Sequence, residues 1–415
     1  MVPLLLILIL SCFIGASQGL QVGFYANTCP NAESIVRRVV SEAAASEQNA
    51  PPVLLRLHFH DCFVNGCDGS ILITTGLETD EKSAFGHQGV QGFEIIERAK
   101  AQLEATCPGI VSCADIVALA ARDAVFLTNG PLYEVPTGRR DGLVSNKSLA
   151  DNMPDITDSI DTLKAKFSEK GLSGMDLVLL SSAHTIGTTA CFFMTNRLYE
   201  FTAGGGSDPS INPGFLPELK ATCPQNGNPN TRLAMDRGSG QTFDKQILQN
   251  IRSGFAVLET DARLYEDVAT KRVVDSYFGF FSPVLGPSFE ADFAKAMVKM
   301  GEIGVLTGSE GEIRRLSVVN LNKIFEQIAG DDCFQDIFCV AKISDPVKLS
   351  ASRTKSTAWN CDGSNLLCNS TSSSNCSPWP VGLFGEQKKM ISVLAVYVRS
   401  GKKLSSGPHS IYAIF

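Results

Sequence analysis

The chain has 415 residues, of which 44% are hydrophobic and 19% charged, and its formal net charge is -7. This composition predicts a globular protein with a sizeable buried core. The acidic balance, without a lysine or arginine run, argues against nucleic acid or an anionic membrane surface as the main partner, because both attract basic patches.

The amino-terminal residues predict a secretion signal. Residues 1–20 contain an apolar run from Leu4 to Leu10 followed by small residues around Gly15, although a basic start is missing. No stretch approaches the roughly 20 apolar residues that a membrane-spanning helix needs. We therefore expect residues 1–20 to be removed and a secreted protein without a membrane span to begin near Gln21.

Cysteines and one glycosylation motif agree with secretion. The 13 cysteines favour disulfide bonds over metal thiolates, because an oxidising compartment joins neighbouring thiols. Cys12 lies in the signal, and Asn146 begins an Asn-Lys-Ser acceptor sequence for a glycan. An odd group of cysteines lies in ordered-looking sequence, so that one lacks a partner there: Cys29, Cys62, Cys67, Cys107, Cys113, Cys191 and Cys223.

Residues 31–293 read as mainly helical. Apolar side chains recur at helical spacing from Ile35 to Ala43 and again from Ile116 to Ala121, whereas the alternation of a strand is scarce. Proline and glycine separate these stretches, which is typical of many short helices joined by ordered loops. We predict a mainly α fold.

The composition changes after Asn320. Within residues 321–415, the stretch "NCDGSNLLCNSTSSSNCSPWP" is rich in serine and asparagine, low in charge and without a sustained period, and basic and apolar residues follow it. We expect either a true appendage or an error in the predicted gene product, such as a retained intron. Low-complexity sequence without a period cannot bury a core, which favours the error and a disordered or absent tail.

The stretch "LLRLHFHDCFVNGCDGS", residues 54–70, concentrates reactive side chains. If Pro51 and Pro52 open a helix, Arg56 and His60 share one face one turn apart. A guanidinium beside an imidazole disfavours the imidazolium and leaves a neutral base next to a fixed positive charge. This pair suits proton transfer from a weak acid, although a structural core histidine is the commoner occurrence.

Two metal sites come into question in the same stretch. A zinc site built on His58 and His60 is disfavoured, because positions two apart on a helix diverge and no third ligand stands nearby. A calcium loop fits better, since Ca²⁺ takes six to eight oxygen ligands. Side chains of Asp61, Asp68 and Ser70, with the backbone of Val64 and Gly66, offer such oxygens.

A second informative stretch is "LSGMDLVLLSSAHTIG", residues 172–187. Ser173 and Asp176 resemble a capping box, and Leu177, Leu180 and His184 then fall on one helical face. A histidine there is more often structural. A ligand histidine needs a partner for its other ring nitrogen, which the spacing alone does not name.

Four stretches together resemble the secretory (class III) plant haem peroxidases. They are "LRLHFHDCFVNGCDGS" at 55–70, "VSCADIVALAARDAV" at 111–125, "VPTGRRDG" at 135–142 and "LSSAHTIG" at 180–187. The likeness runs in order from Gln21 to about Asn320. It implies a haem peroxidase domain over residues 21–320, with two helical lobes enclosing one non-covalent b-type haem, since no Cys-x-x-Cys-His occurs.

The resemblance implies the roles of the site residues. His60 would move the proton of H₂O₂, Arg56 would stabilise the developing charge, and Phe59 would line the same distal pocket. His184 would hold the iron, with Asp261 accepting its other N–H. Pro154 would help to position phenolic donors at the haem edge.

Two calcium sites and three disulfides are also implied. The distal calcium ligands would be Asp61, Val64, Gly66, Asp68 and Ser70, with Glu81 linking the site to the distal pocket. The proximal calcium ligands would be Thr185, Asp236, Ser239, Thr242 and Asp244. The disulfides would be Cys29–Cys107, Cys62–Cys67 and Cys191–Cys223.

Two departures from the family lie in the domain. Leu316 and Ser317 stand where the usual partner of Cys113 belongs. Losing a disulfide that closes so long a loop lowers the free energy of unfolding by roughly 2 to 5 kcal/mol. Cys333 or Cys339 could replace that partner, but nothing in the sequence shows such a pairing. His87 stands where the family commonly has an asparagine that orients the distal histidine, and a ring nitrogen can accept the same hydrogen bond.

We therefore expect a secreted, monomeric enzyme that reduces H₂O₂ and oxidises small donors in one-electron steps. Cell-wall phenolics, auxin and the response to oxidative stress are family-level possibilities, and the vacuole is the alternative destination. The competing hypothesis is a secreted, calcium- and disulfide-stabilised glycoprotein that binds haem poorly because Cys113 lacks its partner.

Overall fold

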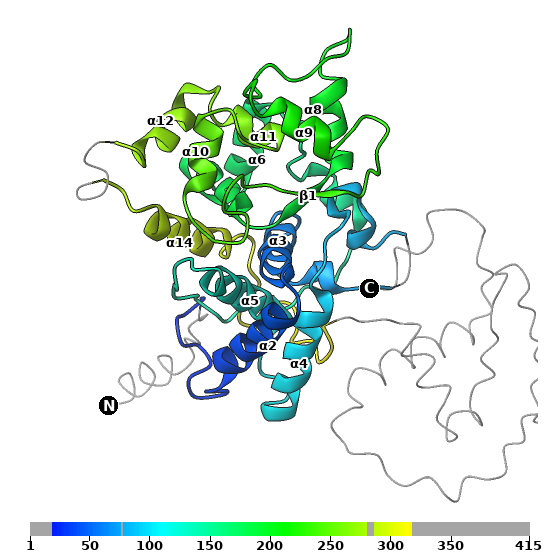
Figure 1. Ribbon diagram of the computed structural model, residues 1–415. Helices are drawn as coiled ribbons and strands as arrows, with labels where there is room; N and C mark the ends of the chain where they lie inside the picture. Colours follow the sequence, from blue (N-terminus) through cyan, green and yellow to red (C-terminus); the bar gives the residue numbers. More distant parts are fainter. Residues whose placement is uncertain (1–18, 76–77, 280–285, 318–415) are drawn as a thin grey trace, which may run out of the picture. The chain divides into compact units, whose positions relative to one another are not determined.

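The computed structural model describes residues 19–75, 78–279 and 286–317, all within one compact unit that ends at Val319 (Figure 1). Most of the predicted signal and the predicted tail at 321–415 lie outside the described residues. Gln21 pairs with Thr137 through two backbone hydrogen bonds of 2.8 and 2.9 Å. The described domain is therefore ordered from the residue at which the mature chain is predicted to begin.

Helices dominate the described residues, as the sequence predicts. The α-helices are α2 Ala32–Ser46, α3 Ala50–Cys62, α4 Phe93–Thr106, α5 Cys113–Leu127, α6 Ile160–Glu169, α7 Gly174–Ser181, α8 Thr195–Tyr199, α9 Leu216–Thr222, α10 Gln246–Arg252, α11 Glu259–Arg263, α12 Val268–Ser276 and α14 Phe289–Met300. The 3₁₀-helices are η1 Ser70–Leu72, η2 Glu81–Ser83, η3 Phe85–His87, η4 Lys147–Asn152, η5 Ser182–Thr185 and η6 Cys191–Met194. Strands β1 Thr188–Ala190 and β2 Arg232–Ala234 pair antiparallel, with Thr189 opposite Leu233.

Two large hydrophobic cores give the fold its two lobes. One core joins α2, α3, α4 and α5 through Val36, Leu57, Ile96 and Leu119. The other joins α7, α10, α12 and α14 through Val178, Ile247, Val274 and Phe293. Figure 1 shows α2, α4 and α5 apart from α10 and α12, with α3 between them. The prediction of a mainly helical, two-lobed fold is confirmed.

Helix α3 contributes to both cores. Leu54 and Leu57 belong to the first core, whereas Leu55 and Cys62 belong to the second. Asn49 precedes the first turn, and proline is tolerated there because the first N–H groups of a helix have no partner within it. The predicted helix over residues 51–61 is therefore confirmed, and packing on two sides leaves it little freedom to shift.

A glycine brings the second lobe against the start of α3. Gly187 has a φ of 99°, and a Cβ placed on it would lie 2.8 Å from Cβ of Pro52. A larger residue here would be strained both by its backbone and by that contact. Gly187 thus permits β1, which follows it, to lie close to the helix that carries Arg56 and His60.

One detail of the sequence prediction is wrong. The capping box of Ser173 and Asp176 is present, but α7 ends at Ser181 and His184 lies in the following 3₁₀-helix η5. His184 is therefore not on one continuous α-helical face with Leu177 and Leu180. The backbone tightens because the chain must leave the helix and reach extended Ile186 just after η5, and 3₁₀ turns are frequent at such ends.

The structure contains the three predicted disulfides, Cys29–Cys107, Cys62–Cys67 and Cys191–Cys223. Cys113 is free and buried, and burial raises the pKa of its thiol to about 12. Cys333 and Cys339, named above as substitute partners without support in the sequence, lie outside the described residues.

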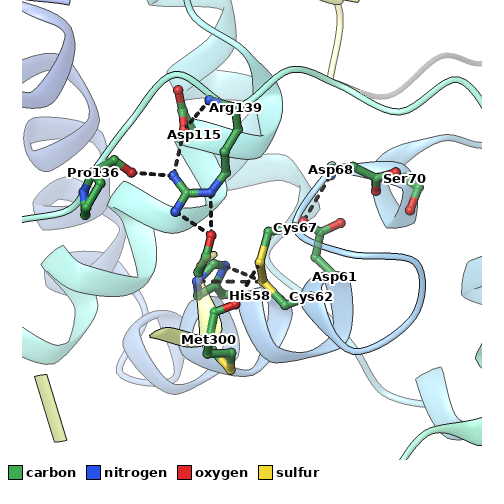
Figure 2. The surroundings of a disulfide bond; sticks show 12 residues. His58, Asp61, Cys62, Cys67, Asp68, Ser70, Asp115, Pro136, Arg139 and Met300 are labelled. Carbon is green, nitrogen blue, oxygen red and sulfur yellow. Dashed lines mark hydrogen bonds and ion pairs between the residues drawn. A yellow bond between two sulfur atoms is a disulfide. The ribbon is translucent and has the colours of Figure 1, made fainter. Parts of the chain in front are cut away.

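Arg139 carries a buried charge with several partners. Its side chain is 1% exposed, and Nη1 lies 2.8 Å from Oδ1 of Asp115, which is fully buried. Nη1 also donates to the carbonyl oxygen of Pro136, and Nε and Nη2 donate to that of Gly301 (Figure 2). The guanidinium thus joins three segments that are far apart in the sequence.

We expect Arg139→Met to lower the free energy of unfolding by about 3 to 5 kcal/mol, because it leaves the Asp115 carboxylate buried without its cation. Urea unfolding followed by circular dichroism measures this change. Arg98→Met is the control, since the pair of Arg98 with Glu42 is about half exposed and such pairs contribute about 0 to 1 kcal/mol. Equal effects of the two variants would contradict the prediction.

Candidate active site

Helix α3 presents the predicted distal residues, Arg56, Phe59 and His60. His60 is buried, and Arg56 and Phe59 are partly exposed. Nη2 of Arg56 donates to the carbonyl oxygen of Gln88 at 3.0 Å, and the Phe59 ring stands edge-on to the His60 ring at 5.4 Å. Four residues on a helix make one turn, which places Arg56 and His60 on the same face as predicted.

The environment keeps His60 neutral. Burial lowers the pKa of His60 well below its usual value, and the charges of Arg56 and His87 lower it further. The sequence analysis named Arg56 as the cause of the neutral imidazole, whereas burial lowers the pKa of His60 more than Arg56 does. Burial also lowers the pKa of Arg56 to about 10, with a contribution from Arg232. At neutral pH the site therefore holds an uncharged imidazole beside a cation.

His87 contacts His60 directly. Nδ1 of His87 lies 2.9 Å from Nδ1 of His60, and both side chains are buried. Burial, with the charge of Arg56, lowers the pKa of His87 to about 4. On its other side, Nε2 of His87 lies 3.8 Å from Oε1 of Glu81. A hydrogen bond between residue 87 and His60, expected from the sequence, is thus present in the structure.

His184 and Asp261 meet across 77 residues of sequence. Nδ1 of His184 lies 3.0 Å from both carboxylate oxygens of Asp261, which is buried on α11. Burial alone would lower the pKa of His184, but the charge of Asp261 and the hydrogen bond to it raise that pKa above its usual value. Nε2 of His184 is left as the nitrogen that can bind a metal ion.

Oxygen atoms without partners gather in the predicted distal calcium loop. Asp61 Oδ1, Ser70 Oγ and both carboxylate oxygens of Glu81 are buried and have no hydrogen-bond partner in the described part of the chain. Burial and the neighbouring carboxylates of Asp68 and Glu81 raise the pKa of Asp61 well above its usual value. A hard divalent cation would offset this crowding of acidic groups, so the donor set fits Ca²⁺.

The backbone of the same loop is tightly held. Gly66 has a φ of 131°, and a Cβ on it would lie 2.4 Å from the carbonyl oxygen of Gly304. The carbonyl oxygen of Val64 accepts a hydrogen bond from Nζ of Lys170 at 2.8 Å, so a cation there would share this oxygen. Sequence reasoning missed Lys170, because no motif marks a lysine that reaches a loop 106 residues away.

The five predicted proximal calcium residues also come together. Oγ1 of Thr185 donates to Oδ2 of Asp236 at 2.8 Å and approaches the carbonyl oxygen of Thr242 at 3.3 Å. Oγ of Ser239 approaches Oδ2 of Asp236 and Oδ1 of Asp244 at 3.1 and 3.2 Å. Burial raises the pKa of Asp236 to about 6, with Asp244 adding to the effect. These oxygens satisfy one another in this arrangement, directly beside His184.

Other predicted positions are less engaged. Pro154 is half-buried in the loop between η4 and α6. Asn146 caps η4 by accepting hydrogen bonds from the backbone N–H and the hydroxyl of Ser148. Among the described residues, no hydrogen bond joins Pro154 or Asn146 to a histidine.

His58 has a different environment from His60. Its Nδ1 lies 3.5 Å from Sγ of Cys62, beside the disulfide to Cys67 (Figure 2). Burial, with the charge of Arg139, lowers the pKa of His58 to about 3. Because Cys62 and Cys67 are bonded to each other and His60 turns to His87, the described residues provide no support for a zinc site on the two histidines of α3.

Comparison with known proteins agrees with this arrangement. The family model described as Peroxidase matches residues 36–279. Peroxidase 43 of Arabidopsis thaliana is 68% identical over 309 residues, which cover 74% of this chain and 94% of that protein. Peroxidase 13 of the same plant is 57% identical over 72% of this chain, and Peroxidase N1 of Nicotiana tabacum is 48% identical over 77% of it. The alignments cover 91% and 96% of those two relatives.

The chain belongs to the peroxidase family. The match spans α3, the segment with His184 and the helix with Asp261. The peroxidase has no helix among its described residues that is long and apolar enough to cross a membrane.

We expect His60→Ala to lower kcat/KM for H₂O₂ in this peroxidase by about 100- to 10,000-fold, the usual contribution of a positioned general base. Steady-state kinetics at saturating donor measures the loss. His58→Gln is the matched control: it removes a buried imidazole from the same helix, away from Arg56. A comparable loss in both variants would show that packing of α3, and not proton transfer, causes the effect.

Proposed function

We propose that this peroxidase binds one b-type haem between its lobes, reduces H₂O₂ and oxidises small phenolic donors one electron at a time. The observation that carries the proposal is the pair of histidine environments. His60 is a neutral base beside Arg56, and His184 has Nδ1 held by Asp261 and Nε2 left for iron. The bound haem would supply the electrons that reduce the peroxide and would afterwards take electrons from the donor.

The distal residues would handle the proton and the charge. Nε2 of His60 accepts a proton from H₂O₂ and returns it to the leaving oxygen, so that water departs. The guanidinium of Arg56 stabilises the negative charge that develops as the O–O bond breaks. The hydrogen bond from its Nη2 to the carbonyl oxygen of Gln88 holds one terminal nitrogen of the guanidinium in place.

The proximal residues would set the strength of the iron ligand. Asp261 accepts the hydrogen on Nδ1 of His184 and makes the other ring nitrogen more basic, which favours a more oxidised iron. The side chain of His184 is 34% exposed although Asp261 is 1% exposed. This contrast fits a ligand whose ring a cofactor can reach while its partner stays buried in the protein.

Two calcium ions would complete the enzyme, one in each predicted loop. The unpartnered oxygens near Asp61 and the acidic pair of Asp236 and Asp244 support them. Pro154 would help to place small donors, such as cell-wall phenolics and auxin. We further propose that the enzyme is monomeric and secreted, to the cell wall or the vacuole, with a glycan on Asn146.

No observation favours an impaired glycoprotein. Although Cys113 has no disulfide in the described residues, the segment that follows Gly311 is anchored by other bonds. Arg314 donates to the carbonyl oxygens of Gly69 and Gly142, and Ser317 donates to the carboxylate of Glu97. The loop of the distal calcium site is therefore held without that disulfide.

The deciding test compares secreted chains ending at residue 415 and at residue 320, with haem supplied. We expect both to show a Soret band and H₂O₂-dependent guaiacol oxidation, because the described domain ends before residue 320. His184→Ala is expected to abolish the Soret band of the bound form, whereas the control His58→Gln retains it. Absence of haem binding in both unsubstituted chains would overturn the proposed function.

We expect calcium removal with EDTA to lower activity and thermal stability together, since acidic groups would then repel one another beside both histidines. Differential scanning calorimetry and guaiacol oxidation, before and after CaCl₂ is restored, measure the effect. Asp68→Asn should weaken calcium binding and cause part of the same loss of activity and thermal stability. Unchanged activity in a chain shown by elemental analysis to be calcium-free would contradict the assignment.

A further inference from the structure

Arg232 is fastened to the strand that follows His184. Strand β1 begins at Thr188, shortly after His184, and β2 begins at Arg232. Nε of Arg232 donates to Oγ1 of Thr188 at 3.0 Å, and Nη2 donates to the carbonyl oxygen of Thr188 at 2.7 Å. Two bonds to one residue hold the guanidinium on β1. Its third nitrogen, Nη1, makes no hydrogen bond with the described residues and is free for a ligand.

The start of β1 lies against helix α3. Gly187 immediately precedes β1, and a Cβ placed on it would lie 2.8 Å from Cβ of Pro52. Pro52, Arg56 and His60 follow one another at single-turn spacing along α3 and therefore share one face. The anchor of Arg232 is thus next to the residue that begins the row containing Arg56.

Two positive charges meet at this place. The charge of Arg232 contributes, after burial, to the lowered pKa of Arg56. Among the described residues, neither arginine forms an ion pair with a carboxylate, whereas Arg237 in the same segment lies 3.1 Å from Glu218. Like charges that are held close together destabilise a fold unless an anion offsets them. The pair of guanidiniums therefore points to an anionic ligand.

The proposed b-type haem carries a suitable anion. Its propionate carboxylates stand at one edge of the ring, and a guanidinium offers a planar fork of donors that matches a carboxylate. Arg232 is exposed, and it belongs to the strand pair that directly follows the proposed iron ligand His184. A carboxylate that meets this cation would stay in contact with water and escape the cost of burying a charge.

We propose that Arg232 binds a propionate of the haem and holds the cofactor by its edge, in addition to the iron ligand. This inference rests on the proposed function, because it requires haem beside His184. The bound carboxylate would also offset the repulsion between Arg232 and Arg56. Arg232 is a cofactor-binding residue in this role and contacts neither the peroxide nor the donor.

Haem release measures this contact without turnover. Full-length, haem-loaded protein is mixed with excess apomyoglobin, and the rate of haem transfer gives the dissociation rate constant. We expect Arg232→Gln to raise this constant about 10-fold, the lower end for a hydrogen bond to a charged group, because the arginine is exposed. Arg232→Lys should recover part of the loss, since it keeps the charge without the fork. Arg98→Gln removes an exposed cation from α4 and should change nothing.

Haem with esterified propionates shows whether the carboxylate is the partner. The dimethyl ester has no anionic edge, so the unsubstituted protein should release it faster than haem, and Arg232→Gln should add no further effect. An equal effect of the substitution on haem and on ester would show that Arg232 acts by packing and would overturn the inference. Unchanged haem release in Arg232→Gln would overturn it as well.

A donor is the other source of a carboxylate. If Arg232→Gln raised KM for ferulate, a carboxylated phenol, but changed neither KM for guaiacol nor haem release, the arginine would serve the donor and the inference would be wrong. An unsubstituted chain that binds neither haem nor its ester rejects the proposed function and this inference with it. A chain that binds haem but releases it equally fast with and without Arg232 rejects the inference alone.

Discussion

Helix α3 lies between two hydrophobic cores, and this packing decides where the reactive groups of the peroxidase stand. Leu54 and Leu57 bury one side of the helix and Leu55 and Cys62 another, so rotation of the helix would expose apolar surface on whichever side it turned. Arg56 and His60 project from the remaining side. Their relative position is thus fixed by the burial of neighbours that take no part in the chemistry.

The same burial creates an electrostatic problem that the surrounding groups resolve. Removing His60 from water keeps it neutral, whereas the adjacent Asp61 shares its dry environment with other carboxylates. One residue of α3 therefore gains function from desolvation, and the next is destabilised by it unless a cation is near. The proposed calcium ion would make both demands compatible on consecutive residues.

Sequence reasoning foresaw much of this arrangement, because the informative patterns were local. The helix behind Pro51, the capping box at Ser173 and the contact of residue 87 with His60 followed from spacing or from long motifs. The 3₁₀ turn at His184 was missed, since helical periodicity continues through it while the chain direction changes. Gln88 and Lys170 were missed because their contacts depend on tertiary packing, and burial as the main cause of the His60 pKa needed the whole fold.

The free Cys113 shows how the fold tolerates a lost crosslink. A disulfide stabilises mainly by restricting the unfolded chain, whereas hydrogen bonds act in the folded state. Arg314 binds two carbonyls of the loops around Asp68, and its backbone N–H donates to Asp141. These bonds fix the position of the carboxyl-terminal segment as a disulfide would, but they do not narrow the unfolded ensemble. The absence of the crosslink should thus affect the unfolding equilibrium more than the geometry around His60.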